Sequence, residues 1–443
     1  MKRRLIQILL ITFIGFIGST CKKSADEIPP SLTVNPSLKE VDAKQGSFTI
    51  NVLSTTSWTA SSPDNWITLS SSTSAGNGTI KVNFLANAML SDRTGTIIAK
   101  GNGVADKIIT VKQKGIADSL AIVLDTSFVK GADISWLPQM EATGYKFFNS
   151  QGQEQDCFQI LKDHGINAIR LRTWVNPSNN AIDGHCSKDE TVAMAIRVKK
   201  WGMRVMIDFH YSDSWADPSK QVKPAVWKDH NFPQLLNDVY NYTFDVMTAL
   251  KNAGVTPTWV QIGNEISPGM LLPDGSTSNN WGQLAQLVNK GYDAVKAVSP
   301  YSNVVLHLDQ GNSNSRFRWW FDNATSNNMK YDVIGLSYYP YWIDGHPDYS
   351  LSINDLGNNL LDLAQRYGKE VMVVEVGGED IQAQNTYDML VAVQHKIKAV
   401  PNHKGLGVMY WEPEGAKSWS GYPLSAWGSD GKPTMALDAF LLK

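Results

Sequence analysis

Two glutamates lie at the ends of strongly apolar segments of this 443-residue chain. Glu265 ends the segment WVQIGNE (259–265), directly after Asn264, and Glu375 lies in VMVVEVGG (371–378). Runs of β-branched apolar residues are typical of buried parallel strands. A carboxylate is costly in a core, but it is expected at the carboxyl end of a barrel strand, where active sites open.

Two facing carboxyl groups are the working parts of a glycosidase. One protonates the leaving oxygen and the other meets the oxocarbenium-like carbon, and in retaining enzymes they stand about 5–5.5 Å apart. The acid needs a raised pKa, whereas hydrogen-bond donors must keep the nucleophile ionised. Asn264 is a candidate contact for a sugar hydroxyl beside the reacting carbon. Candidate donors to Glu375 are Arg170 or Arg172, His210 and Tyr338.

The rest of the chain after residue 127 alternates strand-like and helix-like segments. Strands are predicted at 129–134, 168–174, 204–211, 259–265, 304–309, 333–339, 371–376 and 407–412. Helical stretches such as DETVAMAIRVKKWG and WGQLAQLVNKGYDAVKAV lie between them. Eight strand–helix repeats predict an α/β fold, a TIM (β/α)8 barrel over residues 128–443. The alternative, a doubly wound sheet, would need a glycine-rich phosphate loop after its first strand, and none is found.

Polar, charged and aromatic residues recur where the predicted strands end. Any one of them has a structural explanation, such as a buried ion pair for Arg170. Their sum is better explained by a site at the carboxyl end of the barrel. They are Asp133, Arg170, Arg172, Asn176, His210, Tyr211, Asn264, Glu265, His307, Asp309, Tyr338, Tyr339, Glu375, Trp411 and Glu412.

Residues 34–115 have a different character. They are rich in Ser, Thr, Gly and Val, with short alternating runs such as FTINV and TIKVNF. This pattern predicts a small all-β, immunoglobulin-like sandwich, joined to the barrel by a linker at 116–127. Trp58 and Trp66 are predicted to lie in its core, and an exposed carbohydrate platform is the alternative.

The N-terminus has the pattern of a bacterial lipoprotein. A basic start and an apolar run predict a signal peptide at 1–20, followed by the lipidation site Cys21 and a polar tether over 21–33. A Gram-negative outer-membrane location is expected, at the cell surface or on the periplasmic face, and plain secretion is the alternative. Cys157 and Cys186 cannot form a disulfide framework, and whether they pair is open.

Composition narrows the function classes. The formal net charge of −2 argues against nucleic acid and gives no polybasic membrane patch. No Cys/His cluster has zinc spacing. Neither a metal nor a cofactor is expected. The 15 Trp and 15 Tyr residues offer flat faces on which sugar rings stack. A monomer is expected.

Several segments of the barrel resemble glycoside hydrolase family 53, the endo-β-1,4-galactanases. The Asn264-Glu265 pair and Glu375 match the wider clan, which also contains cellulases, mannanases and xylanases. The narrower resemblance rests on GADISWL (131–137), IRLRTWVNP (169–177), IDFHYSDSWADP (207–218), WVQIGNEI (259–266), DVIGLSYYPYW (332–342) and GVMYWEP (407–413).

That resemblance implies roles for individual residues. Glu265 would be the acid/base and Glu375 the nucleophile, with retention, and β-1,4-galactan of pectin side chains would be the substrate. Trp215, Tyr339, Trp342 and Trp411 would stack on galactose rings. Asn176, His210, Asn264, Asp309 and Tyr338 would make polar contacts with the sugar, together with Arg170.

Two further comparisons belong to the resemblance. Residues 34–115 resemble the sandwich module often found N-terminally in carbohydrate enzymes of the Bacteroidetes (BACON), which implies a spacer or glycan-contacting role.

Some bacterial galactanases hold calcium in a long loop after strand seven, but here VGGEDIQAQNTYDML turns quickly into a helix. It lacks the dense oxygen-ligand run that calcium needs, so no structural calcium is predicted.

Other functions remain open at this point. The chain would be a glycan-binding lipoprotein if the barrel had lost its chemistry, because fold does not settle function. A second alternative keeps the hydrolytic chemistry and changes the substrate to another β-1,4-glycan. Transglycosylation beside hydrolysis is open to any retaining enzyme, and neither the number of sugar subsites nor the preferred chain length is predicted.

Overall fold

A computed structural model describes residues 29–87, 92–115 and 127–442 of the chain. The predicted signal peptide, Cys21, most of the tether and all but one residue of the linker at 116–127 lie outside the described residues. The chain divides into two compact units, Met1–Leu120 and Ala121–Lys443.

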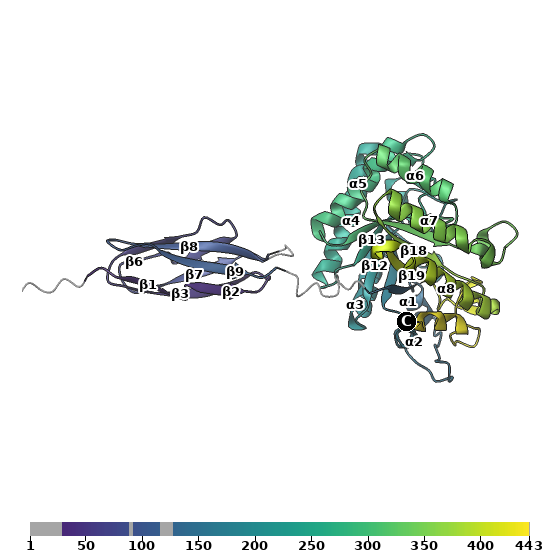
Figure 1. Ribbon diagram of the computed structural model, residues 1–443, viewed down its shortest axis with the longest axis horizontal. Coiled ribbons are helices and arrows are strands. Elements are labelled where there is room, and N and C mark those ends of the chain that lie inside the picture. Colours follow the sequence, from purple (N-terminus) through teal and green to yellow (C-terminus); the bar gives the residue numbers. More distant parts are fainter. Residues whose placement is uncertain (1–28, 88–91, 116–126, 443) are drawn as a thin grey trace, which may run out of the picture. The chain divides into compact units, whose positions relative to one another are not determined.

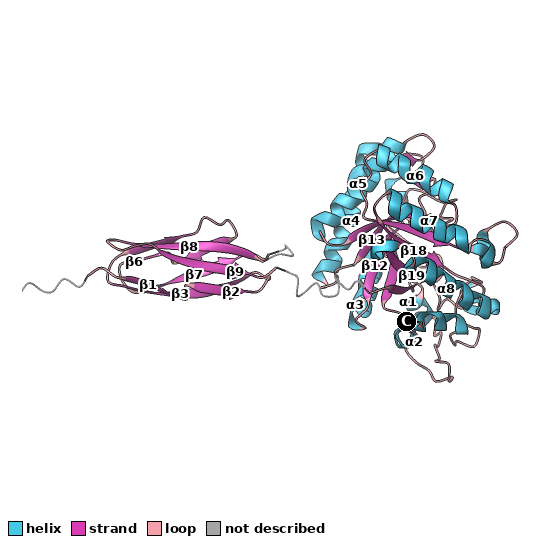
Figure 2. Cartoon of the chain, in the orientation of Figure 1, coloured by secondary structure: helices cyan, strands magenta, loops and turns pink. Residues whose placement is uncertain are grey.

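In the described part of the first unit, strands are the only regular elements (Figures 1 and 2). One sheet has the order β1-β3-β7-β5 and the other β2-β9-β8-β4-β6. The strands are β1 (Leu32–Asn35), β2 (Leu38–Val41), β3 (Gly46–Ser54), β4 (Trp58–Ser61), β5 (Ile67–Ser70), β6 (Thr73–Ser74), β7 (Gly78–Phe84), β8 (Arg93–Gly101) and β9 (Lys107–Gln113). Buried and exposed residues alternate along β7, β8 and β9, as expected for sheets with one face on a core.

The core of this sandwich contains both tryptophans. Trp58 and Trp66 are buried in one cluster with residues such as Ile80 and Ile109. The Trp58 indole N–H donates to the Gly76 carbonyl at 2.7 Å. The prediction that these tryptophans form core, and not an exposed platform, is confirmed.

The second unit is a closed barrel of eight parallel strands, which confirms the predicted TIM fold. The strands are β10 (Val129–Asp133), β11 (Ala168–Thr173), β12 (Arg204–Phe209), β13 (Trp259–Ile262), β16 (Asn303–Leu308), β17 (Val333–Tyr338), β18 (Glu370–Val376) and β19 (Gly405–Trp411). Strand β10 pairs with both β11 and β19, and this closes the ring. A small antiparallel ribbon, β14 (Gly269–Met270) and β15 (Gly275–Ser276), follows β13.

Helices surround the barrel strands (Figure 2). They are α1 (Leu137–Ala142), α2 (Cys157–Asp163), α3 (Lys188–Lys200), α4 (Phe232–Asn252), α5 (Trp281–Val298), α6 (Asn314–Ser326), α7 (Ile353–Arg366), α8 (Ala383–Lys398) and the short α9 (Lys417–Ser420). Capping explains where α3 begins: the Ser187 side chain accepts from the Glu190 N–H, and the Glu190 carboxylate accepts from the Ser187 N–H.

The side chains on the inner face of the barrel strands form two layers, one apolar and one polar. An apolar cluster takes at least one residue from each strand: Val129, Ala168, Met206, Trp259, Val305, Val333, Met372, Val374 and Met409. Successive side chains of a strand face opposite sides, so residues two or four positions further on share this inner face. These are Asp133, Arg170, Asp208, Gln261, His307 and Ser337, which form a polar layer above the apolar one.

Strand β18 departs from this alternation. Leu336 pairs with Val373, but Ser337 pairs with Glu375, so Val374 is an extra residue at a β-bulge. Without the bulge, Glu375 would share the outer face with Val373. The register shift therefore turns the carboxylate of Glu375 toward the polar layer.

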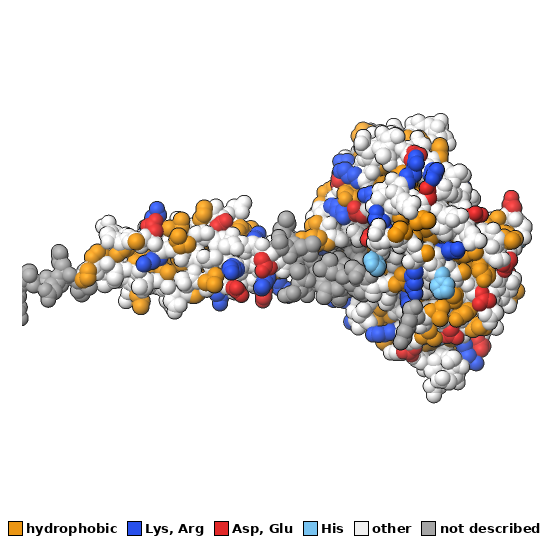
Figure 3. Space-filling model, viewed as in Figure 1, with side chains coloured by type: hydrophobic (Ala, Val, Ile, Leu, Met, Phe, Trp, Pro, Cys, Tyr) orange, Lys and Arg blue, Asp and Glu red, His pale blue; other side chains and the backbone are white. Residues whose placement is uncertain are grey.

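Cys157 and Cys186 are both buried free thiols, which answers the question of their pairing. No helix in the described residues is long and apolar enough to cross a membrane. On the face shown in Figure 3, basic and acidic side chains are interspersed, in keeping with the small net charge.

The sandwich core gives a stability prediction with a matched control in one strand. Ile109 of β9 is fully buried, whereas its neighbour Ile108 is 62% exposed. Ile109→Ala is expected to lower the free energy of unfolding of the sandwich by about 2–5 kcal/mol, because it removes buried methyl groups and leaves a cavity. Ile108→Ala should change it little. Calorimetry of the full chain checks this, and equal effects of the two substitutions would contradict the assigned core.

Candidate active site

Arg170 of β11 is the centre of the polar layer. Its guanidinium is fully buried and bonds Asp133 Oδ2 and Asp208 Oδ2 at 2.8 Å each, and Glu375 Oε1 at 2.9 Å. Burial opposes its charge, but the carboxylates of Asp208, Glu375 and Asp133 outweigh burial and raise the pKa of Arg170. A permanent cation is thus fixed directly beside Glu375.

Glu375 is buried at the end of β18. Burial raises the pKa of its carboxyl to about 7, and Arg170 is the main influence in the opposite direction. The Tyr339 hydroxyl donates to Glu375 Oε2 at 3.2 Å and also favours the ionised form. The sequence-based prediction that Tyr338 donates to Glu375 is wrong, because the adjacent tyrosine does so.

Glu265 follows β13 in a left-handed backbone conformation with φ of 45°, which is uncommon for a residue with a side chain. Its Oε1 lies 2.6 Å from the Ser337 hydroxyl at the end of β17. Burial and the charge of Glu375 raise the pKa of Glu265 well above its usual value. In contrast to Glu375, Glu265 has no cation among the described residues in ion-pair contact with it.

The two glutamates are close enough to act on one bond. Carboxylate oxygens of Glu265 and Glu375 and a ring nitrogen of His307 all lie within 4.8 Å of one another. This spacing fits the retaining geometry, in which the two carboxyl groups stand about 5–5.5 Å apart.

The same three groups do not favour a metal ion. Their atoms already have other partners: His307 Nε2 lies 2.7 Å from the Ser337 hydroxyl and Glu375 Oε1 lies 2.9 Å from Arg170. The positive charge of Arg170, in contact with Glu375, would repel a metal cation bound there. We therefore assign Glu265 and Glu375 to acid–base and nucleophilic chemistry.

A pocket of about 560 Å³ opens over the two glutamates. Eight residues predicted from the sequence line it: His210, Trp215, Asn264, Glu265, Tyr339, Trp342, Glu375 and Trp411. The pocket is also lined by residues that were not predicted as site residues from the sequence: Ala216, Asp217, Pro218, Ser219 and Tyr422. Residues 216–218 belong to the quoted segment IDFHYSDSWADP (207–218), so a signal was available for them, but Ser219 lies just beyond it and Tyr422 lies in a loop with no motif.

Aromatic rings form one wall of this pocket. The Trp411 ring lies 4.8 Å from Tyr422 and 5.8 Å from Trp215, centroid to centroid, both edge-on. Behind them the buried Arg172 guanidinium lies 4.5 Å from the Trp215 ring and pairs with Glu412. The cation and the rings hold each other in place, so the exposed faces of Trp215 and Trp411 are preorganised.

Four predicted contacts lie outside the pocket lining. Tyr338 is fully buried on the outer face of β17, where its hydroxyl bonds Ser352 at 2.9 Å, so its predicted sugar contact is wrong. Asn176 is exposed on the loop after β11, and its backbone N–H donates to Asp213. Asp309 bonds Ser267 and pairs with Arg316 at 3.5 Å. Arg170 lies beneath the pocket and contacts Glu375 instead.

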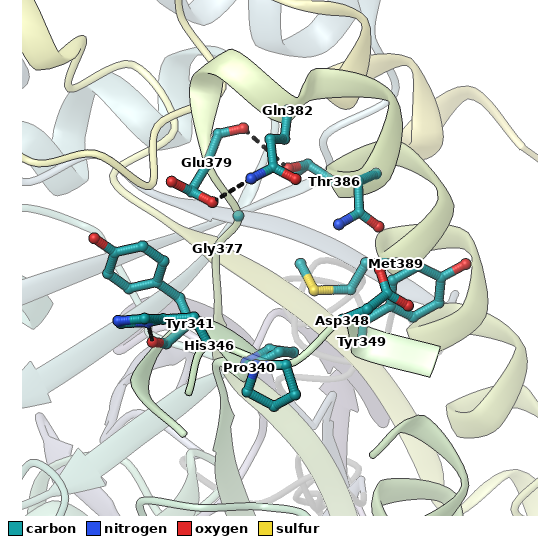
Figure 4. A pocket seen from close by; sticks show the side chains of 13 residues that line it. Pro340, Tyr341, His346, Asp348, Tyr349, Gly377, Glu379, Gln382, Thr386 and Met389 are labelled. Carbon is teal, nitrogen blue, oxygen red and sulfur yellow. Dashed lines mark hydrogen bonds between the residues drawn. The ribbon is translucent and has the colours of Figure 1, made fainter. Parts of the chain in front are cut away.

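A second pocket of about 210 Å³ lies beside the first, between the loops that follow β17 and β18 (Figure 4). Its two acids are already engaged: Glu379 accepts from the Gln382 amide at 2.6 Å, and Asp348 accepts from the Ser350 N–H. Figure 4 shows them at separate places around the pocket, so they do not form a second carboxylate pair.

Comparison with known proteins identifies the chain's relatives. Residues 129–440 match the profile of Glycosyl hydrolase family 53, and residues 56–114 match the BACON profile, described as a putative N-terminal binding domain. An uncharacterized protein of Niallia circulans is 37% identical, covering 69% of this chain and 89% of its own. An arabinogalactan endo-β-1,4-galactanase of Thermothelomyces thermophilus is 34% identical, covering 64% and 89%.

Solved structures agree with the sequence comparison. A structure from a study of two fungal β-1,4-galactanases superposes with a TM-score of 0.65 at 30% identity, covering 71% of this chain and 99% of the other. The profile match spans the whole barrel and includes both glutamates of the site. The chain therefore belongs to glycosyl hydrolase family 53.

Proposed function

We propose that the protein is an endo-acting, retaining galactanase. It cleaves β-1,4-galactosidic linkages in galactan, as in the side chains of pectic arabinogalactan, and releases galacto-oligosaccharides. The observation that carries the proposal is the unequal environment of two neighbouring carboxyl groups. Glu375 touches Arg170, whereas Glu265 touches a serine and, within the described part of the chain, no cation. The family and the galactanases similar to this chain support the choice of substrate.

The chemistry follows from that inequality. Glu375, ionised beside Arg170, attacks the anomeric carbon, and the glycosidic bond breaks as Glu265 gives its proton to the leaving oxygen. A covalent glycosyl-enzyme forms on Glu375. Glu265, now ionised, takes a proton from water, which attacks the same carbon and frees Glu375. Each carboxyl group thus begins the cycle in the protonation state that its surroundings favour.

The pocket lining supports a sugar chain as the substrate. Trp342 is 60% exposed on one loop, and Trp215, Trp411 and Tyr422 form the aromatic wall. Aromatic faces bind sugar rings through their apolar C–H surfaces without fixing a chain end. Asn264 and His210 supply polar groups beside the two glutamates.

The protein is further proposed to be a monomeric lipoprotein anchored through Cys21 in a Gram-negative outer membrane. The basic start, the apolar run and the small residues before Cys21 support the anchor. Cell-surface exposure would give the enzyme access to a polymer too large to diffuse inward, so the surface is preferred over the periplasmic face.

Loss of the anchor cysteine gives a test of location. Cys21→Ser is expected to move galactanase activity from the membrane fraction to the soluble fraction, because the lipid attachment point is gone. Fractionation and metabolic labelling with a fatty-acid probe would measure it. Label on the Cys21→Ser variant, or none on the unmodified protein, would contradict the anchor.

The proposed activity is tested with purified protein on galactan, xylan, mannan and cellulose. Short galacto-oligosaccharides from galactan are expected. Glu265→Ala and Glu375→Ala should each lower kcat by at least about 10²–10⁴-fold, because each removes a group that acts on the reacting bond. Glu370→Gln, at the opposite end of the same strand as Glu375, is the matched control and should change kcat little.

Each other result has a definite meaning. Cleavage of a different glycan would keep the two glutamates in their roles and overturn the substrate. Binding of galactan without cleavage would replace the enzyme by a glycan-binding protein.

The pH dependence tests the assignment of nucleophile and acid. Activity should rise as Glu375 ionises and fall as Glu265 loses its proton. Tyr339→Phe removes a hydrogen bond to the ionised Glu375, so the pKa of Glu375 rises and the acidic limb of kcat/KM moves to higher pH, by about 0.4–1.1 units. Tyr338→Phe, on the outer face, should leave that limb in place. An acidic limb that moves down in Tyr339→Phe would reverse the assignment.

A further inference from the structure

A chain of buried polar groups leads away from the acid/base. Glu265 Oε1 lies 2.6 Å from Ser337 Oγ, Ser337 Oγ lies 2.7 Å from His307 Nε2, and His307 Nδ1 lies 3.0 Å from Asn264 Oδ1. Ser337 and His307 are almost fully buried and do not line the pocket. Neither residue takes part in the reaction steps of Glu265 and Glu375.

The orientation of the Asn264 amide is fixed at the far end of this chain. Its Nδ2 donates to the Ala216 carbonyl at 2.8 Å, and its Oδ1 accepts from Arg170 Nη2 at 2.9 Å. Arginine has no acceptor, so the atom that faces it must be the amide oxygen. That oxygen also faces His307 Nδ1, and Nδ1 must therefore carry a hydrogen to bond it.

His307 is neutral, so its second nitrogen carries no hydrogen. Burial, with Arg170 and His210 nearby, holds the pKa of His307 well below its usual value. Nε2 is then an acceptor, and it takes the single hydroxyl hydrogen of Ser337. Only lone pairs of the serine oxygen are left to face Glu265, and a carboxyl group can bond them only when it is protonated.

We propose that His307, held as its Nδ1–H tautomer by Asn264, and Ser337 form a relay that retains the proton on Glu265 until the leaving oxygen accepts it. The proposal rests on the proposed function, because it concerns the acid/base of that reaction. His307 and Ser337 are positioning residues: they act on Glu265 and do not touch the sugar. Once Glu265 is ionised, Ser337 has one hydrogen for two acceptors, so the chain favours return of the proton.

The opposite tautomer would reverse the effect. His307 Nδ1 also lies 3.2 Å from the Gln261 amide nitrogen and 3.4 Å from the Glu265 N–H. If it accepted from these, Nε2–H would donate to Ser337, and the Ser337 hydroxyl would donate to Glu265 Oε1. That direction requires an ionised Glu265 and lowers the pKa of Glu265. Both contacts are longer than the 3.0 Å contact with Asn264, and the Gln261 amide already donates to Asp208 at 2.5 Å. We therefore assign the Nδ1–H form.

Other charges face the same groups, and the test must leave them unchanged. Glu265 faces Glu375, Asp309 and Asp217, and His307 faces Arg170 and His210. Ser337→Ala alters none of these side chains. Any change it makes to the titration of Glu265 therefore reports on the hydrogen-bond chain.

The first test is the pH profile of the full-length Ser337→Ala variant on galactan. Loss of the acceptor for the Glu265 proton should move the basic limb of kcat/KM to lower pH, by about 0.4–1.1 units. A basic limb that moves to higher pH, or does not move, overturns the proposal. Ser352→Ala is the matched control, since it deletes a buried serine hydroxyl on the outer side of the barrel.

The second test needs no turnover. Nitrogen-15 spectra of histidine-labelled protein, with His307 assigned by its loss in His307→Asn, should show a protonated Nδ1 and a bare Nε2 near neutral pH. A protonated Nε2, or a doubly protonated ring, overturns the relay. The expected tautomer in a protein that fails to cleave galactan would refute the proposed function and leave the tautomer assignment standing.

Discussion

The buried guanidinium of Arg170 is the interaction on which the site depends. Three carboxylates, Asp133, Asp208 and Glu375, meet this one cation inside the barrel. Buried carboxylates without such a partner would take up protons or repel one another. Because Arg170 touches Glu375 and not Glu265, it makes two chemically identical side chains unequal, and that inequality decides which one attacks and which one donates a proton.

The barrel separates the forces that stabilise it from the groups that react. Its lower interior is filled by apolar residues from all eight strands, and the polar layer lies above them. One irregularity breaks the regular pattern at the point where chemistry requires it: the bulge in β18 turns Glu375 inward. A departure from ideal strand geometry beside an active site is common in such folds. Here it places the nucleophile beside its cation.

The hydrogen-bond chain from Asn264 to Glu265 connects Arg170 to the acid as well as to the nucleophile. Arg170 fixes the Asn264 amide, and Asn264 in turn fixes the hydrogen on His307. One cation thus acts on both glutamates: directly on Glu375 as a charge, and on Glu265 through the orientation of an amide. Buried polar networks of this kind specify one arrangement, since each group has few alternative partners.

Pattern and spacing in the chain were sufficient for the eight strands, the separate sandwich with its core tryptophans, and the two glutamates, because these depend on local hydrophobic periodicity and on acids at strand ends. They were not sufficient for the face on which a side chain lies. Tyr338 and Tyr339 are adjacent and chemically equal, yet one packs against Ser352 and the other bonds Glu375. Ser337, Asp208 and Gln261 lie inside segments that resemble the family, but no pattern in those segments assigns them a role. Their roles follow from strand register and from the bulge in β18, which are set by hydrogen bonds between segments far apart in the chain, and no local pattern contains that information.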